Sequence, residues 1–383
     1  MTTTPERPEK VTFSLLQIFR GWAAVLVILV HVSWITYDKY STVFLKNYFA
    51  MGAAGVDFFF VLSGFLICHI HLKDIGRPKQ TIPYLTKRLI RIYPIYWLVT
   101  LVILPTYFLV PNYGQGDETH PAIIAGSFLL YPISRAPILV AGWTLCHEML
   151  FYFIFAFLIG VRSRWALGGA LLWACGVFAS VIFAFNEPIN YTGPVHHLFF
   201  WPQNLEFILG CIAAFIFARM NILNISQAQR RLCLTLLALG IFAFLLTGLL
   251  TEDFLNIQLG KHVLVYGALS FLIVITSALI DCSGGLSPAC VNNFAYRAMH
   301  YMGNASYSIY LVHGPCLSAT FKLLSHHNFI TKIGVIPATW MIIIFTILVG
   351  CACHAFVEQP LLDWLRRTML PRKIPATAPS GVP

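Results

Sequence analysis

Long apolar segments separated by short polar loops fill most of the 383-residue chain. A helix needs roughly 20 apolar residues to cross a hydrocarbon core about 30 Å thick, and ten segments approach or reach that length. The expected spans are 14–36, 52–72, 89–110, 143–161, 165–186, 203–219, 232–250, 262–280, 304–324 and 335–357. The pattern predicts an all-α polytopic membrane helix bundle of about ten transmembrane helices, plus a shorter segment at 122–132 that is re-entrant or interfacial.

Basic residues are distributed unequally between the two sides of this predicted bundle. With the N-terminus in the cytoplasm, eighteen Lys and Arg fall on the inner side and six on the outer side. Cytoplasmic loops are normally the Lys- and Arg-rich ones. If 122–132 also crossed the membrane, Arg366 and Arg367 would lie outside, which argues against a crossing. Both termini are therefore expected in the cytoplasm, with 1–12 as a short N-terminal segment and 361–383 as a partly disordered tail.

Composition excludes several classes of protein. A chain with 58% hydrophobic and only 10% charged residues does not form a soluble domain, so its surroundings are a lipid bilayer. Insertion topology accounts for the net charge of +10, and we expect no nucleic-acid partner. The ten cysteines form no CxxC pair, and we expect no metal site.

The first span carries two ionisable side chains that a membrane helix normally excludes, Arg20 and His31. Eleven residues correspond to about three helical turns, so the two side chains share one face and lie roughly 16 Å apart along the axis. Burying them in hydrocarbon costs at least a few kcal/mol each. They are therefore expected to face the bundle interior and to mark a site for a ligand or for chemistry.

Other polar residues can be sorted by depth in the predicted topology. Arg88 and Arg91 share one face at the inner start of their span, near the depth of Arg20. Asp57 and Glu148 enter from the outer side, near the depth of His31. An inner cationic layer below an acid/base layer suits a phosphate-bearing donor such as acyl-coenzyme A, with His31 as general base and a carboxylate orienting it.

Simpler interpretations of the same residues remain open. Arg88 and Arg91 are also suited to anchoring their helix at the membrane surface. Asp57 is also suited to capping a helix start, and His313 to a structural hydrogen bond. Glu358, which lies two residues before a proline, is expected only to mark the end of the last span.

Five motifs occur in order along the chain. They are Arg20-Gly-Trp-Ala-Ala followed by His31, Gly55-Val-Asp-Phe-Phe-Phe-Val-Leu-Ser63-Gly-Phe65, Arg88-Leu-Ile-Arg91, Trp143-Thr-Leu-Cys-His-Glu148-Met-Leu-Phe-Tyr152 and Ser306-Tyr-Ser-Ile-Tyr310-Leu-Val-His313. In this order they resemble the acyltransferase-3 family of bacterial integral membrane acyltransferases. Thr144 stands where the family usually has Ser, which keeps the hydroxyl group.

The resemblance implies a membrane acyltransferase domain over 13–360, located in the bacterial inner membrane. It implies transfer of an acyl group, usually acetyl, from acyl-coenzyme A as co-substrate to a hydroxyl of an exopolysaccharide, O-antigen or lipid-linked glycan. Polysaccharide-assembly proteins are further expected partners, and no cofactor is expected. It implies that His31 is the catalytic histidine and that Arg20, Arg88 and Arg91 bind acyl-coenzyme A. The depth argument adds Glu148 and Asp57 as catalytic candidates. Additional candidates for the site are Ser63, Trp143, Tyr310 and His313.

Two alternatives stay open from the sequence. A membrane transporter of acyl donor or glycan would also bury polar residues, although the chain shows no inverted repeat. Transfer through a covalent acyl-enzyme on His31 or Ser63 is the second alternative.

Overall fold

The computed structural model describes residues 13–42, 44, 50–110, 114, 116–161, 164–185, 193–220, 225–250, 259–286 and 288–370. Over these ranges the chain is helical and contains no strand. The expected N-terminal segment 1–12 lies outside the described residues, as do 371–383 of the expected tail 361–383, whereas 361–369 are helical. The helices are α1 (Ser14–Tyr40), α2 (Ala54–His71), α3 (Thr81–Leu109), α4 (Pro121–Leu129), α5 (Gly142–Gly160), α6 (Arg164–Phe183), α7 (Pro194–Phe200), α8 (Asn204–Arg219), α9 (Gln227–Leu250), α10 (Leu259–Cys282), α11 (Pro288–Val291), α12 (Phe294–Asn304), α13 (Ser306–His326), α14 (Phe329–Ile333), α15 (Val335–Cys353) and α16 (Gln359–Met369).

The all-α membrane bundle predicted from the sequence is confirmed. Among the described residues, nine helical stretches are long and apolar enough to cross a membrane. The tenth expected span, 304–324, corresponds to α13, a helix of 21 residues and therefore about 31 Å long. Polar residues in its first turns make α13 less apolar than the other nine. Several of these polar residues line the cavities described below.

Two further segments show how local sequence sets helix length. The apolar run at 122–132 forms α4, whose nine residues extend about 13 Å and are too short to cross a bilayer. The last span does not stop at Glu358 as expected. It continues through a π-helical turn, His354–Glu358, into α16, because Pro360 occupies the first turn of α16, where its missing N–H is tolerated.

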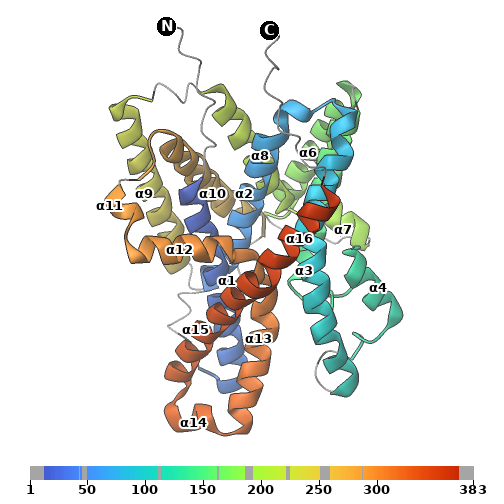
Figure 1. Cartoon of the computed structure of the whole chain (residues 1–383), viewed down its shortest axis with the longest axis vertical. Helices are drawn as coiled ribbons and strands as arrows, with labels where there is room; N and C mark the ends of the chain where they lie inside the picture. Colours follow the sequence, from blue (N-terminus) through green and yellow to red (C-terminus); the bar gives the residue numbers. More distant parts are fainter. Residues whose placement is uncertain are drawn as a thin grey trace, which may run out of the picture.

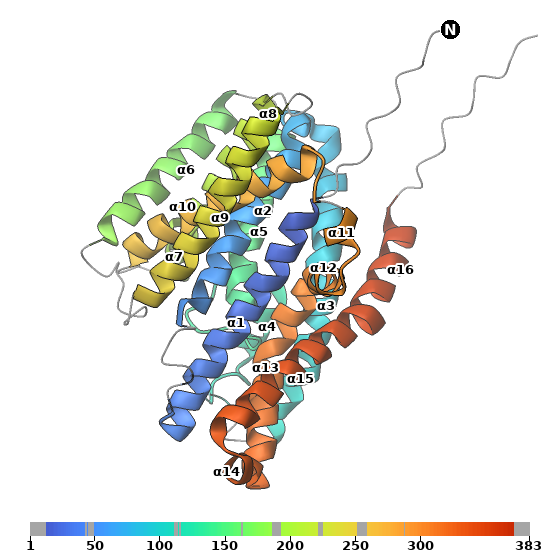
Figure 2. The same cartoon turned by 90° about the vertical axis from the view of Figure 1, so that its left-hand side faces the viewer.

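Helices α1 and α2 form the centre of the bundle. They lie between α6, α9 and α10 on one side and α12, α15 and α16 on the other (Figure 2). In Figure 1 most long helices run along the vertical direction, whereas α12 crosses them near the start of α1. The polar face of α1 lies inside the bundle and borders cavities that residues of α2, α3, α5 and α13 also line.

Two glycines allow α2 and α8 to approach closely. A Cβ atom on Gly64 would lie 2.1 Å from the carbonyl oxygen of Phe207, and one on Gly210 would lie 2.0 Å from that of Val61. Small residues permit such backbone contact between membrane helices, where van der Waals packing drives association. The contact fixes α8 against α2 and thereby the side chains at the start of both helices.

We expect Gly210→Ala to destabilise the protein by about 1–3 kcal/mol, because the added methyl group forces the backbones of α2 and α8 apart. Thermal unfolding in detergent measures the effect. Gly168→Ala is the matched control, since no atom lies within 4 Å of the position that an added Cβ atom would take there. Equal melting temperatures for the two variants would contradict the close contact.

Candidate active site

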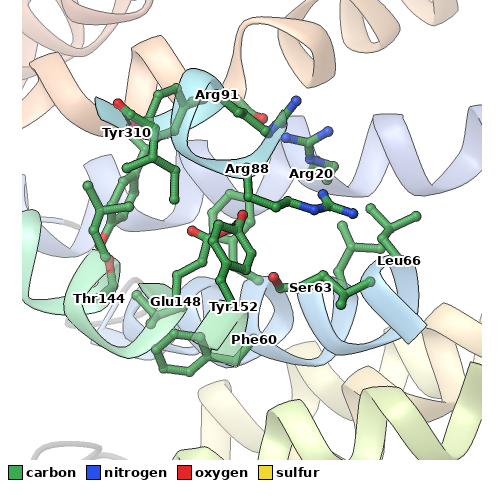
Figure 3. Close-up of a pocket in the computed structure, with 18 of the residues that line it drawn as sticks. Arg20, Phe60, Ser63, Leu66, Arg88, Arg91, Thr144, Glu148, Tyr152 and Tyr310 are labelled. Atoms are coloured by element: carbon green, nitrogen blue, oxygen red, sulfur yellow. Dashed lines mark hydrogen bonds between the residues drawn. The ribbon is translucent and has the colours of Figure 1, made fainter. Parts of the chain in front are cut away.

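The three arginines singled out in the sequence reach one cavity from two helices. Arg20 lies on α1, whereas Arg88 and Arg91 lie one turn apart on α3, and all three line a cavity of about 250 Å³, hereafter the arginine cavity. Figure 3 shows their guanidinium groups gathered at one end. In the described part of the chain, none of them has a carboxylate oxygen within 4.0 Å. The cluster can therefore still bind an anion.

Neighbouring side chains fix this cationic end of the cavity. Arg20 donates from Nη1 to Oε1 of Gln17 at 2.8 Å. The guanidinium carbon of Arg88 lies 5.6 Å from the centre of the Tyr152 ring, within the range of a cation–π contact. Tyr152 in turn donates its hydroxyl proton to Oε1 of Glu148 at 2.5 Å. Glu148 therefore lines the arginine cavity with its carboxylate held in place, and it interacts electrostatically with Arg20.

His31 and His313 line a second cavity of about 760 Å³, hereafter the histidine cavity. Their ring centroids are 4.8 Å apart, with the rings nearly perpendicular. The walls are largely aromatic and apolar and include three tryptophans, Trp34, Trp143 and Trp201. Concave sites with apolar walls and a few polar groups are typical of small-molecule binding.

Backbone contacts determine which nitrogen of each histidine carries a proton. Nδ1 of His31 lies 2.7 Å from the carbonyl oxygen of Val27, and Nδ1 of His313 lies 2.5 Å from that of Tyr310. A carbonyl oxygen only accepts hydrogen bonds, so each Nδ1 is the donor. In a neutral imidazole Nε2 is then the basic nitrogen. Both rings thus have the protonation pattern that a general base requires.

The two cavities adjoin at Val56 and Tyr310, which line both of them. Thr144 Oγ1 donates to the carbonyl oxygen of Ala141 at 3.0 Å, so the Tyr310 hydroxyl donates to Thr144 across 2.8 Å. This bond holds the Tyr310 ring at the boundary. An elongated molecule held by the arginines at one end has the histidine cavity directly beyond Tyr310.

The expectation that Asp57 orients His31 is wrong. Oδ2 of Asp57 lies 2.9 Å from Nε2 of His262, and Oδ1 of Asp57 accepts a hydrogen bond from Gln203 at 3.1 Å. Close packing of α8 and α10 on α2 brings these partners to the fully buried carboxylate. Gln203 and His262 line the histidine cavity, so Asp57 fixes part of its wall. Gln203 and His262 were not predicted as site residues, because each is a single polar residue in apolar surroundings and belongs to no motif.

The remaining candidates fall into the same two groups. Ser63 and Glu148 line the arginine cavity, so Glu148 lies with the arginines and not, as expected, beside His31. Trp143 lines the histidine cavity and packs edge-on against Phe60, with ring centroids 6.4 Å apart. The structure therefore separates a cationic group of residues from an imidazole group, and Tyr310 lines both cavities.

The chain is similar to known proteins over most of its length. A family model described as an acyltransferase domain matches residues 14–355, which include every residue of both groups. The chain belongs to the acyltransferase-3 family. It is a multi-pass membrane acyltransferase that transfers groups other than amino-acyl groups.

Two relatives show the range of related proteins. The exopolysaccharide production protein ExoZ of Rhizobium meliloti is 30% identical over 326 residues, covering 82% of this chain and 91% of that protein. The peptidoglycan O-acetyltransferase OatA of Listeria monocytogenes is 23% identical over 334 residues, covering 81% of this chain but only 51% of that protein. No solved structure matches the chain.

The Tyr310–Thr144 bond gives a stability prediction. We expect Thr144→Val to destabilise the protein by about 1–3 kcal/mol, because it leaves the buried Tyr310 hydroxyl without its acceptor. Thr144→Ser keeps the acceptor and serves as the matched control, with a smaller loss. Thermal unfolding of both variants in detergent measures the difference, and an equally small loss in both would show that the bond is unimportant.

Proposed function

We propose that this protein transfers an acyl group, in the simplest case acetyl, from acyl-coenzyme A to a hydroxyl group of a cell-surface or lipid-linked carbohydrate. One observation carries the proposal: the arginine cavity adjoins the histidine cavity at Tyr310. Coenzyme A has phosphate groups at one end and its thioester at the other. A cationic site beside a site with basic imidazoles suits both ends of such a donor.

The relatives support the choice of acyl group and acceptor. One is named as an O-acetyltransferase of peptidoglycan and another as an exopolysaccharide production protein. Both names refer to glycans. We therefore assign the donor to the arginine cavity and the carbohydrate hydroxyl to the histidine cavity.

The proposed reaction is a direct transfer. Nε2 of His31 takes the proton of the acceptor hydroxyl while its oxygen attacks the thioester carbonyl carbon. The carbon–sulfur bond then breaks, and the leaving thiolate takes the proton from the His31 imidazolium. The products are an O-acyl ester and the free thiol of coenzyme A. His313, edge-on to His31, supports the ring while this proton moves.

The membrane topology fits this division of the two substrates. We propose that the protein lies in the bacterial inner membrane with both termini in the cytoplasm, which places the arginine cavity toward the side that supplies coenzyme A. The acceptor then enters the histidine cavity from the opposite side, delivered by polysaccharide-assembly proteins.

We expect His31→Ala to abolish acyl transfer to envelope glycans while the protein stays folded, because the variant lacks the proton acceptor. Mass spectrometry of ester-linked acyl groups on glycans from complemented deletion strains measures the activity. His326→Ala, an exposed histidine on α13, is the control and should retain full activity. Normal acylation by His31→Ala would remove His31 from the mechanism.

The arginine cavity predicts a specific loss of donor affinity. We expect Arg91→Gln to raise the KM for acyl-coenzyme A by about tenfold, because one charge-assisted contact to phosphate is lost. Arg91→Lys should fall between this variant and the wild type, since an ammonium group cannot form the bidentate contact. Steady-state kinetics at two salt concentrations measures both. Arg367→Gln, an exposed position on α16, should leave KM unchanged.

A further inference from the structure

Glu358 is a buried carboxylate that the mechanism above does not use. Its side chain is 4% exposed, and it ends the π-helical turn between α15 and α16. A π-helical turn replaces i→i+4 hydrogen bonds by i→i+5 bonds, and such turns occur frequently at functional sites. The residue does not end a helix here, so its burial inside a membrane bundle requires another explanation.

Two hydrogen-bond donors hold the Glu358 carboxylate in one position. Its Oε2 accepts from Ser308 Oγ at 2.7 Å and from His354 Nδ1 at 2.7 Å. Ser308 lies on α13 and is fully buried. The preceding residues on the same helix, Ser306 and Tyr307, line the arginine cavity. Glu358 therefore lies behind the wall of the donor site.

From this position Glu358 acts on the arginines without contacting them. It interacts electrostatically with Arg20 and Arg91, yet no oxygen of Glu358 lies within 4.0 Å of either guanidinium group. Arg20 and Arg91 carry like charges and repel one another, which opposes their attraction to Glu358. A carboxylate in direct contact would offset this repulsion, but it would also occupy the N–H groups that a phosphate needs.

We propose that Glu358 is a positioning residue of the donor site, which holds Arg20 and Arg91 together while leaving their N–H groups for the phosphates of acyl-coenzyme A. The inference rests on the proposed donor. The proposal predicts the direction in which donor affinity changes when Glu358 loses its charge. If Glu358 only repelled phosphate, its neutralisation would strengthen donor binding, whereas loss of a positioning charge weakens it.

Binding of two donors to purified wild-type protein and Glu358→Gln tests the proposal. The donors are acetyl-coenzyme A and acetyl-pantetheine, which lacks the phosphates, and affinity is measured from ligand-dependent thermal stabilisation. We expect the variant to bind acetyl-coenzyme A about tenfold more weakly. Its affinity for acetyl-pantetheine should stay unchanged. A merely structural role would alter both affinities alike.

Two further variants keep the test decisive if Glu358→Gln folds poorly. Ser308→Ala keeps the charge but removes one of its two anchors, and should weaken acetyl-coenzyme A binding by a smaller factor, with acetyl-pantetheine again unaffected. Asp363→Asn is the control, because Asp363 is an exposed carboxylate on α16 and lines neither cavity. It should leave both affinities unchanged.

The outcomes separate this inference from the proposed function. If the wild type does not bind acetyl-coenzyme A, the proposed donor is wrong. If the wild type binds it, but Glu358→Gln and Ser308→Ala bind it equally well or more tightly, the donor stands and the positioning role of Glu358 is overturned. Equal weakening toward both donors also overturns it.

Discussion

The repulsion among three guanidinium groups inside a membrane bundle is the constraint on which the rest of the site depends. Arg20, Arg88 and Arg91 line one cavity without a carboxylate in ion-pair contact within the described residues. Such charges are expensive in hydrocarbon unless something compensates them. Aromatic rings and carboxylates at a distance offset part of this cost. The remaining charge is what makes the cavity suited to an anionic ligand.

The second feature of the site is the boundary at Tyr310. Because this side chain lines both cavities, the cationic group and the two histidines are neighbours although they come from different parts of α1, α3 and α13. α1 sets the separation of Arg20 and His31, which lie about three turns apart on it. In the proposed function, this spacing sets the distance between the phosphates of the donor and the site of acyl transfer.

Much of this arrangement could be predicted from the sequence, and the exceptions share one cause. Helical periodicity placed Arg88 and Arg91 on one face, and the predicted topology placed both near the depth of Arg20. The partners of Asp57 and the position of Glu148 could not be predicted in this way. They depend on how α8 and α10 pack against α2, and on which face of α5 meets α3. Contacts such as that of Gly210 with Val61 set the rotation of each helix about its axis. The hydropathy of the sequence does not reveal this rotation.

The burial of Glu358 is another feature that could not be predicted from the sequence. A proline two residues later suggested a helix end, whereas the helix continues because that proline occupies the first turn of α16. The burial of Glu358 follows from its contact with Ser308 on α13, a residue 50 positions earlier. Contacts between residues so distant in the chain are a property of the packed bundle.

A cryo-electron microscopy structure of the protein with a thioether analogue of acetyl-coenzyme A would show how the donor occupies the two cavities. We expect phosphate density against Arg20, Arg88 and Arg91, with the sulfur atom past Tyr310 and facing His31. Phosphates bound away from the arginine cavity, or an acyl end outside the histidine cavity, would contradict this expectation.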